Sequence, residues 1–178
     1  QQLHQYGSPA TTAHTGGRYF GFVNGGILPV TLATKWLSDF WDQNTALYVM
    51  SPIASKLEDI CEGWLKQLFG LPDNTVAGFV SGTSSAILCG LSAARYKLLQ
   101  NQGWDFNQQG HNGAPPLRII AGRHIHGAVT KAVALLGFGL DNIEWVEGDD
   151  QGRILPEQLP DLDGSCIVLL QAGNVNSG

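Results

Sequence analysis

A turn rich in small hydroxyl residues separates an apolar run from a helical pattern in the segment VAGFVSGTSSAILCGLSAAR, residues 76–95. The free backbone N–H groups of a helix start, the positive end of its dipole and nearby hydroxyl groups can together hold an anion such as a phosphate. We therefore identify Gly82, Thr83 and Ser84, followed by Ser85, as a candidate phosphate site. The segment lacks the patterns of a Walker loop and of a dinucleotide-binding loop, which argues against nucleotide binding. Simple capping of the helix by the same side chains is the alternative interpretation.

Two histidines, His124 and His126, follow the apolar run IIAG at the start of another helical pattern. Ligands of open parallel sheets collect at the carboxyl ends of the strands, so His126 and the candidate phosphate site are expected to face one crevice. An H-x-H pair can also ligate a metal, but no Asp, Glu or further His stands close by to complete such a site. Histidines that are simply satisfied by hydrogen bonds are the other open interpretation.

A third group of polar residues, QAGNVNSG at residues 171–178, follows the apolar run CIVLL. Small residues and amides at the carboxyl end of a strand can approach a planar ligand closely and offer hydrogen bonds to its polar edge. Asn174 is the candidate binding residue in this group, and a plain turn is the alternative.

Alternating strand and helix patterns position these three groups. Strands are predicted at residues 76–80, 117–121, 143–146 and 166–170, and helices at residues 29–44, 52–69, 84–99, 128–136 and 156–162. The runs IIA and IVLL lack polar alternation, which is typical of strands covered on both faces. The order of the elements predicts an α/β fold with a mostly parallel sheet flanked by helices.

Composition argues against several classes of partner. The net charge is −5 and the basic residues are scattered, which disfavours nucleic acid or a membrane surface as a partner. No apolar run approaches the roughly 20 residues of a membrane span, and the first residues lack the pattern of a signal peptide, so a cytoplasmic location is expected. Three widely spaced cysteines in apolar stretches predict buried free thiols: Cys61, Cys89 and Cys166. The absence of an initiator Met and the stop just after a strand-like run suggest a piece of a longer protein.

The order of the motifs resembles that of the group II pyridoxal-phosphate-dependent decarboxylases, which include aromatic amino acid and glutamate decarboxylases. The resemblance is carried by SGTSSA with the following helix and AAR, by HGAVTKAVALLG, by AGNVNSG, and by the earlier segments RYFGFVNGG and SPIASKLEDICEGWL. It extends over residues 16–178. It implies part of the large domain of the fold type I pyridoxal-phosphate-dependent transferase fold. Residues 1–28 would then be an amino-terminal segment with a substrate-pocket loop, and residues 29–178 an incomplete cofactor-binding domain.

The resemblance also implies roles for individual residues. The turn at residues 82–84 matches the positions that hold the phosphate of pyridoxal phosphate. His126, and not His124, matches the catalytic histidine that stacks on the cofactor ring and can relay protons near neutral pH. Asn174 matches a position near the phenolic oxygen of the ring. A loop that lines the substrate pocket is matched by Phe22, Val23 and Asn24.

The sequence departs from a working enzyme of this family in two ways. It lacks the family's H-V-D-x-A-like motif, whose carboxylate faces the pyridine nitrogen, and it lacks the lysine that binds the cofactor covalently. Its five lysines all lie in helical patterns. We therefore expect the amino-terminal part of a homodimeric decarboxylase that acts on an amino acid, with the chain alone inactive. A non-catalytic half-domain that needs a partner chain, or another fold type I enzyme such as an aminotransferase or a carbon–sulfur lyase, remains an alternative.

Overall fold

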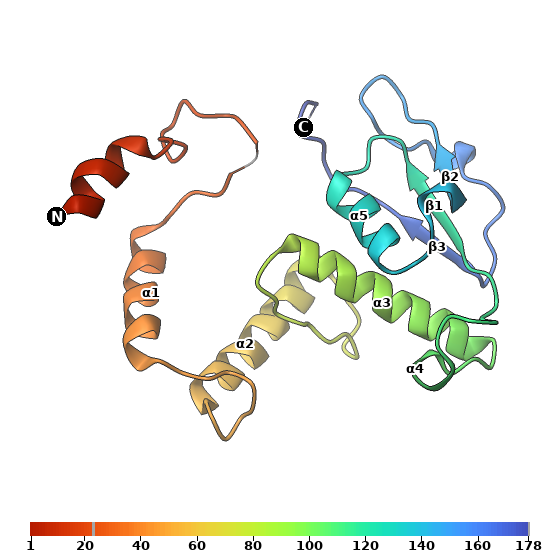
Figure 1. Ribbon diagram of the computed structural model, residues 1–178, viewed down its shortest axis with the longest axis horizontal. Coiled ribbons are helices and arrows are strands. Elements are labelled where there is room, and N and C mark those ends of the chain that lie inside the picture. The colour runs from red at the N-terminus through yellow and green to blue at the C-terminus, as the bar shows by residue number, and fades with distance from the viewer. Residues whose placement is uncertain (23, 178) are drawn as a thin grey trace. The chain divides into compact units, whose positions relative to one another are not determined.

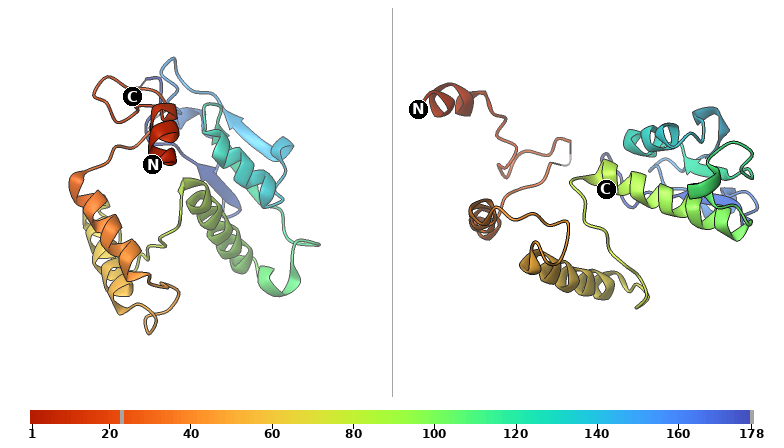
Figure 2. Two further views of the ribbon diagram at one scale, coloured as in Figure 1. Left: turned by 60° about the vertical axis from the view of Figure 1, so that its left-hand side comes forward. Right: turned by 60° about the horizontal axis from the view of Figure 1, so that its bottom comes forward.

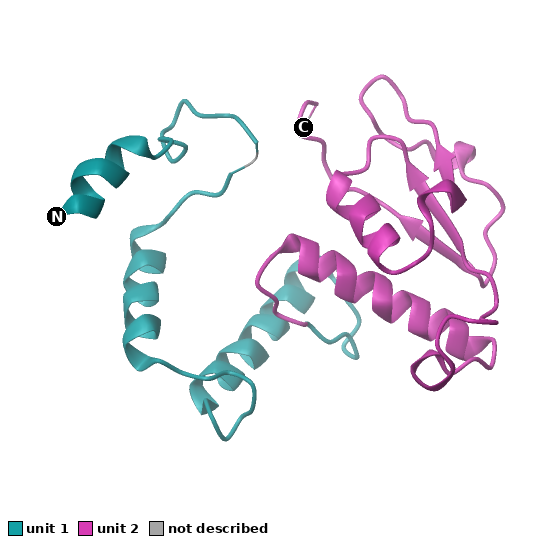
Figure 3. Ribbon diagram, in the orientation of Figure 1, with its two compact units in different colours: residues 1–77 teal, residues 78–178 magenta. Residues whose placement is uncertain are grey.

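The computed structural model describes residues 1–22 and 24–177. Two compact units divide the chain, residues 1–77 and residues 78–178 (Figure 3). The boundary between residues 28 and 29 that the resemblance implies stays a prediction.

The first unit contains two helices, α1 (Pro29–Trp41) and α2 (Pro52–Phe69), which follow the short helices η1 (Leu3–Gly7) and η2 (Ser8–Ala10) (Figure 1). Both α1 and α2 begin with a proline, whose fixed φ suits a first helical turn. The hydroxyl of Ser51 caps α2 by accepting the N–H of Ala54 at 3.4 Å, and Gly70 ends the helix with a φ of 61°. Helix α1 ends earlier than predicted because Asp42 adopts a left-handed conformation with a φ of 47°.

The apolar side chains of α1 and α2 are largely exposed. Ser51 is the one buried residue among the described residues of this unit. Phe40 on α1 is 87% exposed and Leu68 on α2 is 74% exposed. Apolar residues at helical spacing form the packing face of a helix. These faces are therefore suited to pack against a further apolar surface, which the first unit itself does not supply.

The predicted strand at residues 76–80 does not form, because a strand needs a neighbour for its backbone N–H and C=O groups and the described chain offers none. Side chains of α2 instead form hydrogen bonds with the backbone of residues 73–77, which follow the helix. Glu62 accepts the backbone N–H of Ala77 at 2.8 Å, and Lys66 pairs with Glu62 at 2.8 Å and donates to the carbonyl of Asp73 at 3.0 Å. The Lys66 hydrogen bond, together with that from Ala77, lowers the pKa of Glu62.

The second unit is built on a three-stranded parallel sheet of β1 (Arg118–Gly122), β2 (Ile143–Val146) and β3 (Cys166–Leu169). The strand order is β2-β1-β3, so β1 has a neighbour on both sides. This arrangement confirms the predicted parallel sheet flanked by helices, and β2 has the predicted bounds. The remaining elements are α3 (Thr83–Asn101), α4 (Phe106–Gln109), α5 (Gly127–Leu135), η3 (Leu140–Asn142) and η4 (Pro156–Gln158).

Helices α3 and α5 pack against each other and against the sheet (Figure 2). The core consists of apolar residues from α3, α5 and all three strands: Leu91, Ile119, Ala121, Ala132, Val133, Ile143 and Ile167. Residues 119–122 of β1 are all buried, as expected for a strand covered on both faces.

Two further local predictions are wrong. The helix predicted at residues 156–162 is a single 3-10 turn, because Pro160 forces the preceding Leu159 into an extended conformation. The three cysteines are free, as predicted, but they are not buried: Cys61 and Cys166 are half-buried and Cys89 is exposed. Cys89 is exposed because the neighbouring Leu88 and Leu91 are the residues of α3 that contact the core. None of the helices in the described ranges combines the length and apolar character needed to cross a lipid bilayer.

Candidate functional site

The loops that follow the three strands enclose a cavity of about 380 Å³ at the carboxyl edge of the sheet. Its walls come from residues 122–125 after β1, residues 148 and 151–154 after β2, and residues 169–171 and 173–174 around the end of β3. This edge is where open parallel sheets bind ligands, and the volume is within the range for a small molecule.

His124 and Asn174 both line this cavity, whereas His126 lies beside it. Asn174 is half-buried, and its Oδ1 accepts the backbone N–H of Asn176 at 2.8 Å. Its Nδ2 lies only 3.0 Å from the position that a Cβ on Gly152 would occupy. Gly152 has a φ of 78°, so a glycine is needed there both for the backbone conformation and for the close approach of Asn174.

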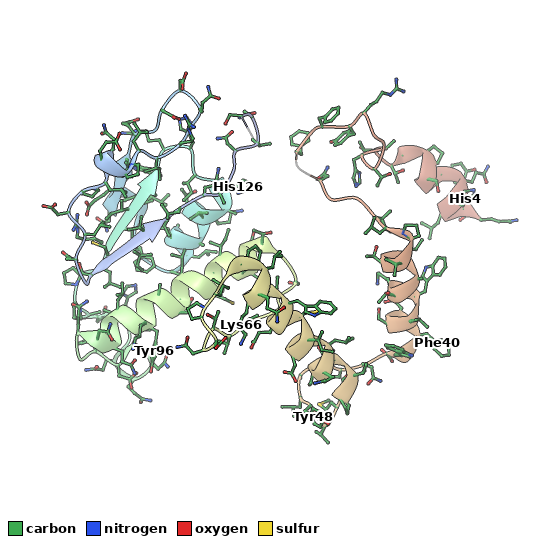
Figure 4. All side chains as sticks on the ribbon, turned by 180° about the vertical axis from the view of Figure 1, so that it is seen from behind. His4, Phe40, Tyr48, Lys66, Tyr96 and His126 are labelled. Carbon is green, nitrogen blue, oxygen red and sulfur yellow. The ribbon has the colours of Figure 1, made fainter. Side chains whose placement is uncertain are left out.

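His126 is the N-cap residue of α5 (Figure 4). Its Nδ1 accepts the backbone N–H of Ala128 at 3.1 Å, so in the neutral ring the hydrogen is on Nε2. Its backbone N–H donates to Oε1 of Gln171 at 2.9 Å, which ties the loop after β1 to the loop after β3. The imidazole is exposed. The Nδ1 atom of His126 is thus satisfied by a hydrogen bond within the chain. Its Nε2 atom and the faces of its ring remain accessible to a ligand.

The candidate phosphate site lies at the start of α3. Gly82 is the N-cap residue in an extended conformation, and no side chain caps the helix. Within the described chain, the backbone N–H groups and hydroxyls of Thr83, Ser84 and Ser85 donate to no acceptor. The interpretation of simple capping is thus wrong. The donors at the positive end of a long helix are free for an anion, and the space around Gly82 is open, since a Cβ there would meet nothing within 4 Å.

The starts of α3 and α5 lie at the same edge of the sheet (Figure 1). Ile87 and Gly90, in the second turn of α3, share a groove with Val129 in the first turn of α5 and with Leu169 at the end of β3. The structure therefore brings residues 82–84, His126 and Asn174 to one edge of the sheet, but neither residues 82–84 nor His126 lines the cavity. The crevice that they are expected to share stays a prediction.

The predicted substrate-pocket residues lie in the first unit. Phe22 and Asn24 are both exposed, and Phe22 has an unusual φ of 58° for a residue other than glycine. Val23 lies outside the described residues.

A flap formed by residues 147–154, which also lines the cavity, was not predicted from the sequence. Gly148 and Ile154 form an antiparallel bridge, and Asp149 accepts the backbone N–H groups of Gln151 and Arg153. Asp149 also pairs with the Arg153 side chain at 2.6 Å, and the Arg153 hydrogen bond lowers the pKa of Asp149. The sequence DDQG was the available signal, since an aspartate followed by a glycine three residues later is typical of a turn.

No group of three metal-ligating side chains occurs among residues 1–22 and 24–177.

Comparison with known proteins gives one family match. The family described as the pyridoxal-dependent decarboxylase conserved domain matches residues 10–162. Cysteine sulfinic acid decarboxylase of Mus musculus is 28% identical over 159 residues, which cover 89% of this chain and 30% of that protein. The corresponding enzyme of Rattus norvegicus is 28% identical over 162 residues, covering 87% of this chain and 32% of that protein. The chain thus spans about a third of the length of these relatives.

Solved structures share the fold. The crystal structure of mouse CSAD matches with a TM-score of 0.68 and 26% identity, over 75% of this chain and 27% of that chain. Oryza sativa TDC, solved with PLP and tryptamine, matches with a TM-score of 0.75 and 23% identity, over 88% of this chain and 33% of that chain. The predicted fold class, part of fold type I, is confirmed.

The capping role of His126 predicts a stability difference between two variants. His126→Ala removes the acceptor for the Ala128 N–H and should lower the free energy of unfolding of the second unit by about 1 kcal/mol. His126→Asn supplies a side-chain oxygen acceptor in place of the ring nitrogen and should stay within about 0.5 kcal/mol of the unsubstituted chain. Urea denaturation followed by circular dichroism measures both. Equal losses in the two variants would contradict the capping role.

Proposed function

Because the chain belongs to the pyridoxal-dependent decarboxylase family, we propose that it is the part of an amino acid carboxy-lyase that binds the cofactor phosphate and stacks on the cofactor ring. Pyridoxal phosphate is the cofactor of the family, and when bound it takes up the electrons left by the departing carboxylate. The observation that carries the proposal is the set of unpaired N–H and hydroxyl donors at the start of α3.

In this proposal Gly82, Thr83 and Ser84 hold the phosphate. Their backbone N–H groups and hydroxyls donate to its oxygens, and the dipole of α3 adds an attraction of about 0.3–1 kcal/mol. Each hydrogen bond to a charged oxygen contributes about 1.5–3 kcal/mol, so a few of them outweigh the loss of hydration at this exposed turn. The absent Cβ of Gly82 lets the phosphate approach the backbone.

His126 and Asn174 act on the cofactor ring. His126 offers an exposed ring face for stacking, and its Nε2–H can donate or exchange a proton while Nδ1 stays bonded to Ala128. Asn174 has its Oδ1 engaged by Asn176, so Nδ2 is the group left to donate to a phenolic oxygen. This division of donors and acceptors supports the two roles that the resemblance implies.

Phe22 and Asn24 contribute to the substrate pocket of the complete protein. The names of the relatives give cysteine sulfinic acid as their substrate. For the complete protein we propose an amino acid substrate, in a cytoplasmic enzyme.

The phosphate site is tested by titrating the chain with pyridoxal phosphate, and separately with inorganic phosphate, while recording backbone amide shifts. Shifts should concentrate at residues 82–85. Ser84→Ala should weaken binding about tenfold, since it removes one hydrogen bond to a charged oxygen. Ser92→Ala is the matched control on the same helix, because its hydroxyl bonds to the carbonyl of Leu88 and lies away from the turn. Shifts that leave residues 82–85 unchanged would refute the site.

The chain alone should release no carbon dioxide from an amino acid in the presence of pyridoxal phosphate. Lys35 and Lys66 are engaged in ion pairs, and the other three lysines are exposed on helices: Lys56, Lys97 and Lys131. None lies in the sequence context of the family's cofactor-binding lysine. Carbon dioxide release that disappears in His126→Ala would overturn this prediction. Release only when a second polypeptide is added would support the alternative of a half-domain with a partner chain.

The chain should form homodimers through the apolar faces of α1 and α2, since exposed apolar surface favours association. Light scattering at high protein concentration should give twice the monomer mass. Phe40→Glu should shift the mass to that of the monomer, whereas Lys56→Glu, also on an exposed position, should not. A clean monomer in the unsubstituted chain would contradict dimer formation.

A further inference from the structure

A second cavity, of about 400 Å³, lies at the end of the sheet opposite the candidate site. The start of β1 and Glu144 of β2 contribute to its wall, whereas the candidate site lies where β1 ends. The loop at residues 114–117 and Phe138, just after α5, add apolar surface to a wall that also contains the polar side chains of His111 and Asn142. The two cavities therefore lie at opposite ends of β1.

Arg95 of α3 is the notable charged group in this wall. Its guanidinium lies 3.9 Å from the ring centre of Phe106 and 5.8 Å from that of Phe138. Its Nη1 donates to the carbonyl of Leu136 at 2.8 Å. Its Nε is buried and has no hydrogen-bond partner. An unpaired buried donor costs about 1–3 kcal/mol, so the guanidinium lacks an acceptor that would stabilise it.

Arg95 also lacks an anion. Among the described residues it forms no ion pair, whereas Arg118, Arg123 and Arg153 each pair with a carboxylate. Arg118, in the same wall, is fully engaged: both oxygens of Glu144 accept its hydrogen bonds at 2.7 Å. Burial without a counter-charge lowers the pKa of Arg95. Among the described residues, Arg95 is therefore the arginine of this wall that has no counter-charge.

We propose that this cavity binds a small organic carboxylate, whose anionic group pairs with Arg95 and whose apolar part packs against the lining. The planar guanidinium fork matches the two oxygens of a carboxylate. A monoanion matches the single positive charge of Arg95, because Arg118 in the same wall is already paired with Glu144. Pro115, Leu117 and Phe138 supply the apolar contacts.

The probe is benzoate, titrated into the 178-residue chain at constant ionic strength and followed by backbone amide shifts. Saturable shifts should appear at residues 111–117 and 136–138, and benzamide, which has the same shape without the charge, should bind at least about tenfold more weakly. No saturable shift with benzoate, equal binding of benzamide, or shifts confined to residues 122–125 would overturn the proposal. Because the phosphate turn lies at the other end of the sheet, this result is independent of cofactor binding.

Two variants separate the carboxylate site from a general charge effect. Arg95→Met should reduce benzoate affinity at least about tenfold. Lys97→Met removes an exposed charge from the same helix and should leave the affinity unchanged. If Arg95→Met does not fold, Ala114→Leu keeps Arg95 and fills part of the cavity, and it should weaken benzoate binding to a similar extent. Unchanged benzoate affinity in Ala114→Leu, or an equal loss in Lys97→Met, would refute the site.

Discussion

The parallel pairing of β1 with a neighbour on each side is the constraint on which the second unit depends. A strand that is buried along residues 119–122 must satisfy its backbone groups within the sheet, and β2 and β3 do so from both edges. Parallel pairing also aligns the carboxyl ends of all three strands. The loops that carry His124, His126 and Asn174 therefore meet at one edge, although the chain positions of these residues are far apart.

The starts of α3 and α5 also lie at that edge, and they differ in how their backbone N–H groups are satisfied. His126 caps the start of α5 with its own ring nitrogen, which accepts the N–H of Ala128. The start of α3 has a glycine at the N-cap position and hydroxyls that bond to nothing in the described chain. The start of α3 therefore has unpaired donors, and the proposed phosphate site rests on this difference.

Much of this arrangement could be predicted from the sequence, since uninterrupted apolar runs such as IVLL indicate buried strands and the order of the motifs indicates the family. The errors arise where a local pattern depends on distant groups. Residues 76–80 have strand composition, but no partner strand is described for them, and Pro160 cuts short a helix that the preceding residues favour. The flap held by Asp149 and the close approach of Asn174 to Gly152 depend on contacts within the folded chain. The spacing of residues along the sequence does not predict such contacts.

The unsatisfied groups of the chain fall into two physical classes. The apolar faces of α1 and α2 and the backbone of residues 76–80 need protein surfaces, because only packed side chains or a neighbouring strand can cover them. The donors at residues 82–85 and the guanidinium of Arg95 need anions, because they are polar groups without acceptors. Further protein could cover the apolar faces and pair with the backbone of residues 76–80 without supplying acceptors to the unpaired donors. Both sets of unpaired donors belong to the second unit.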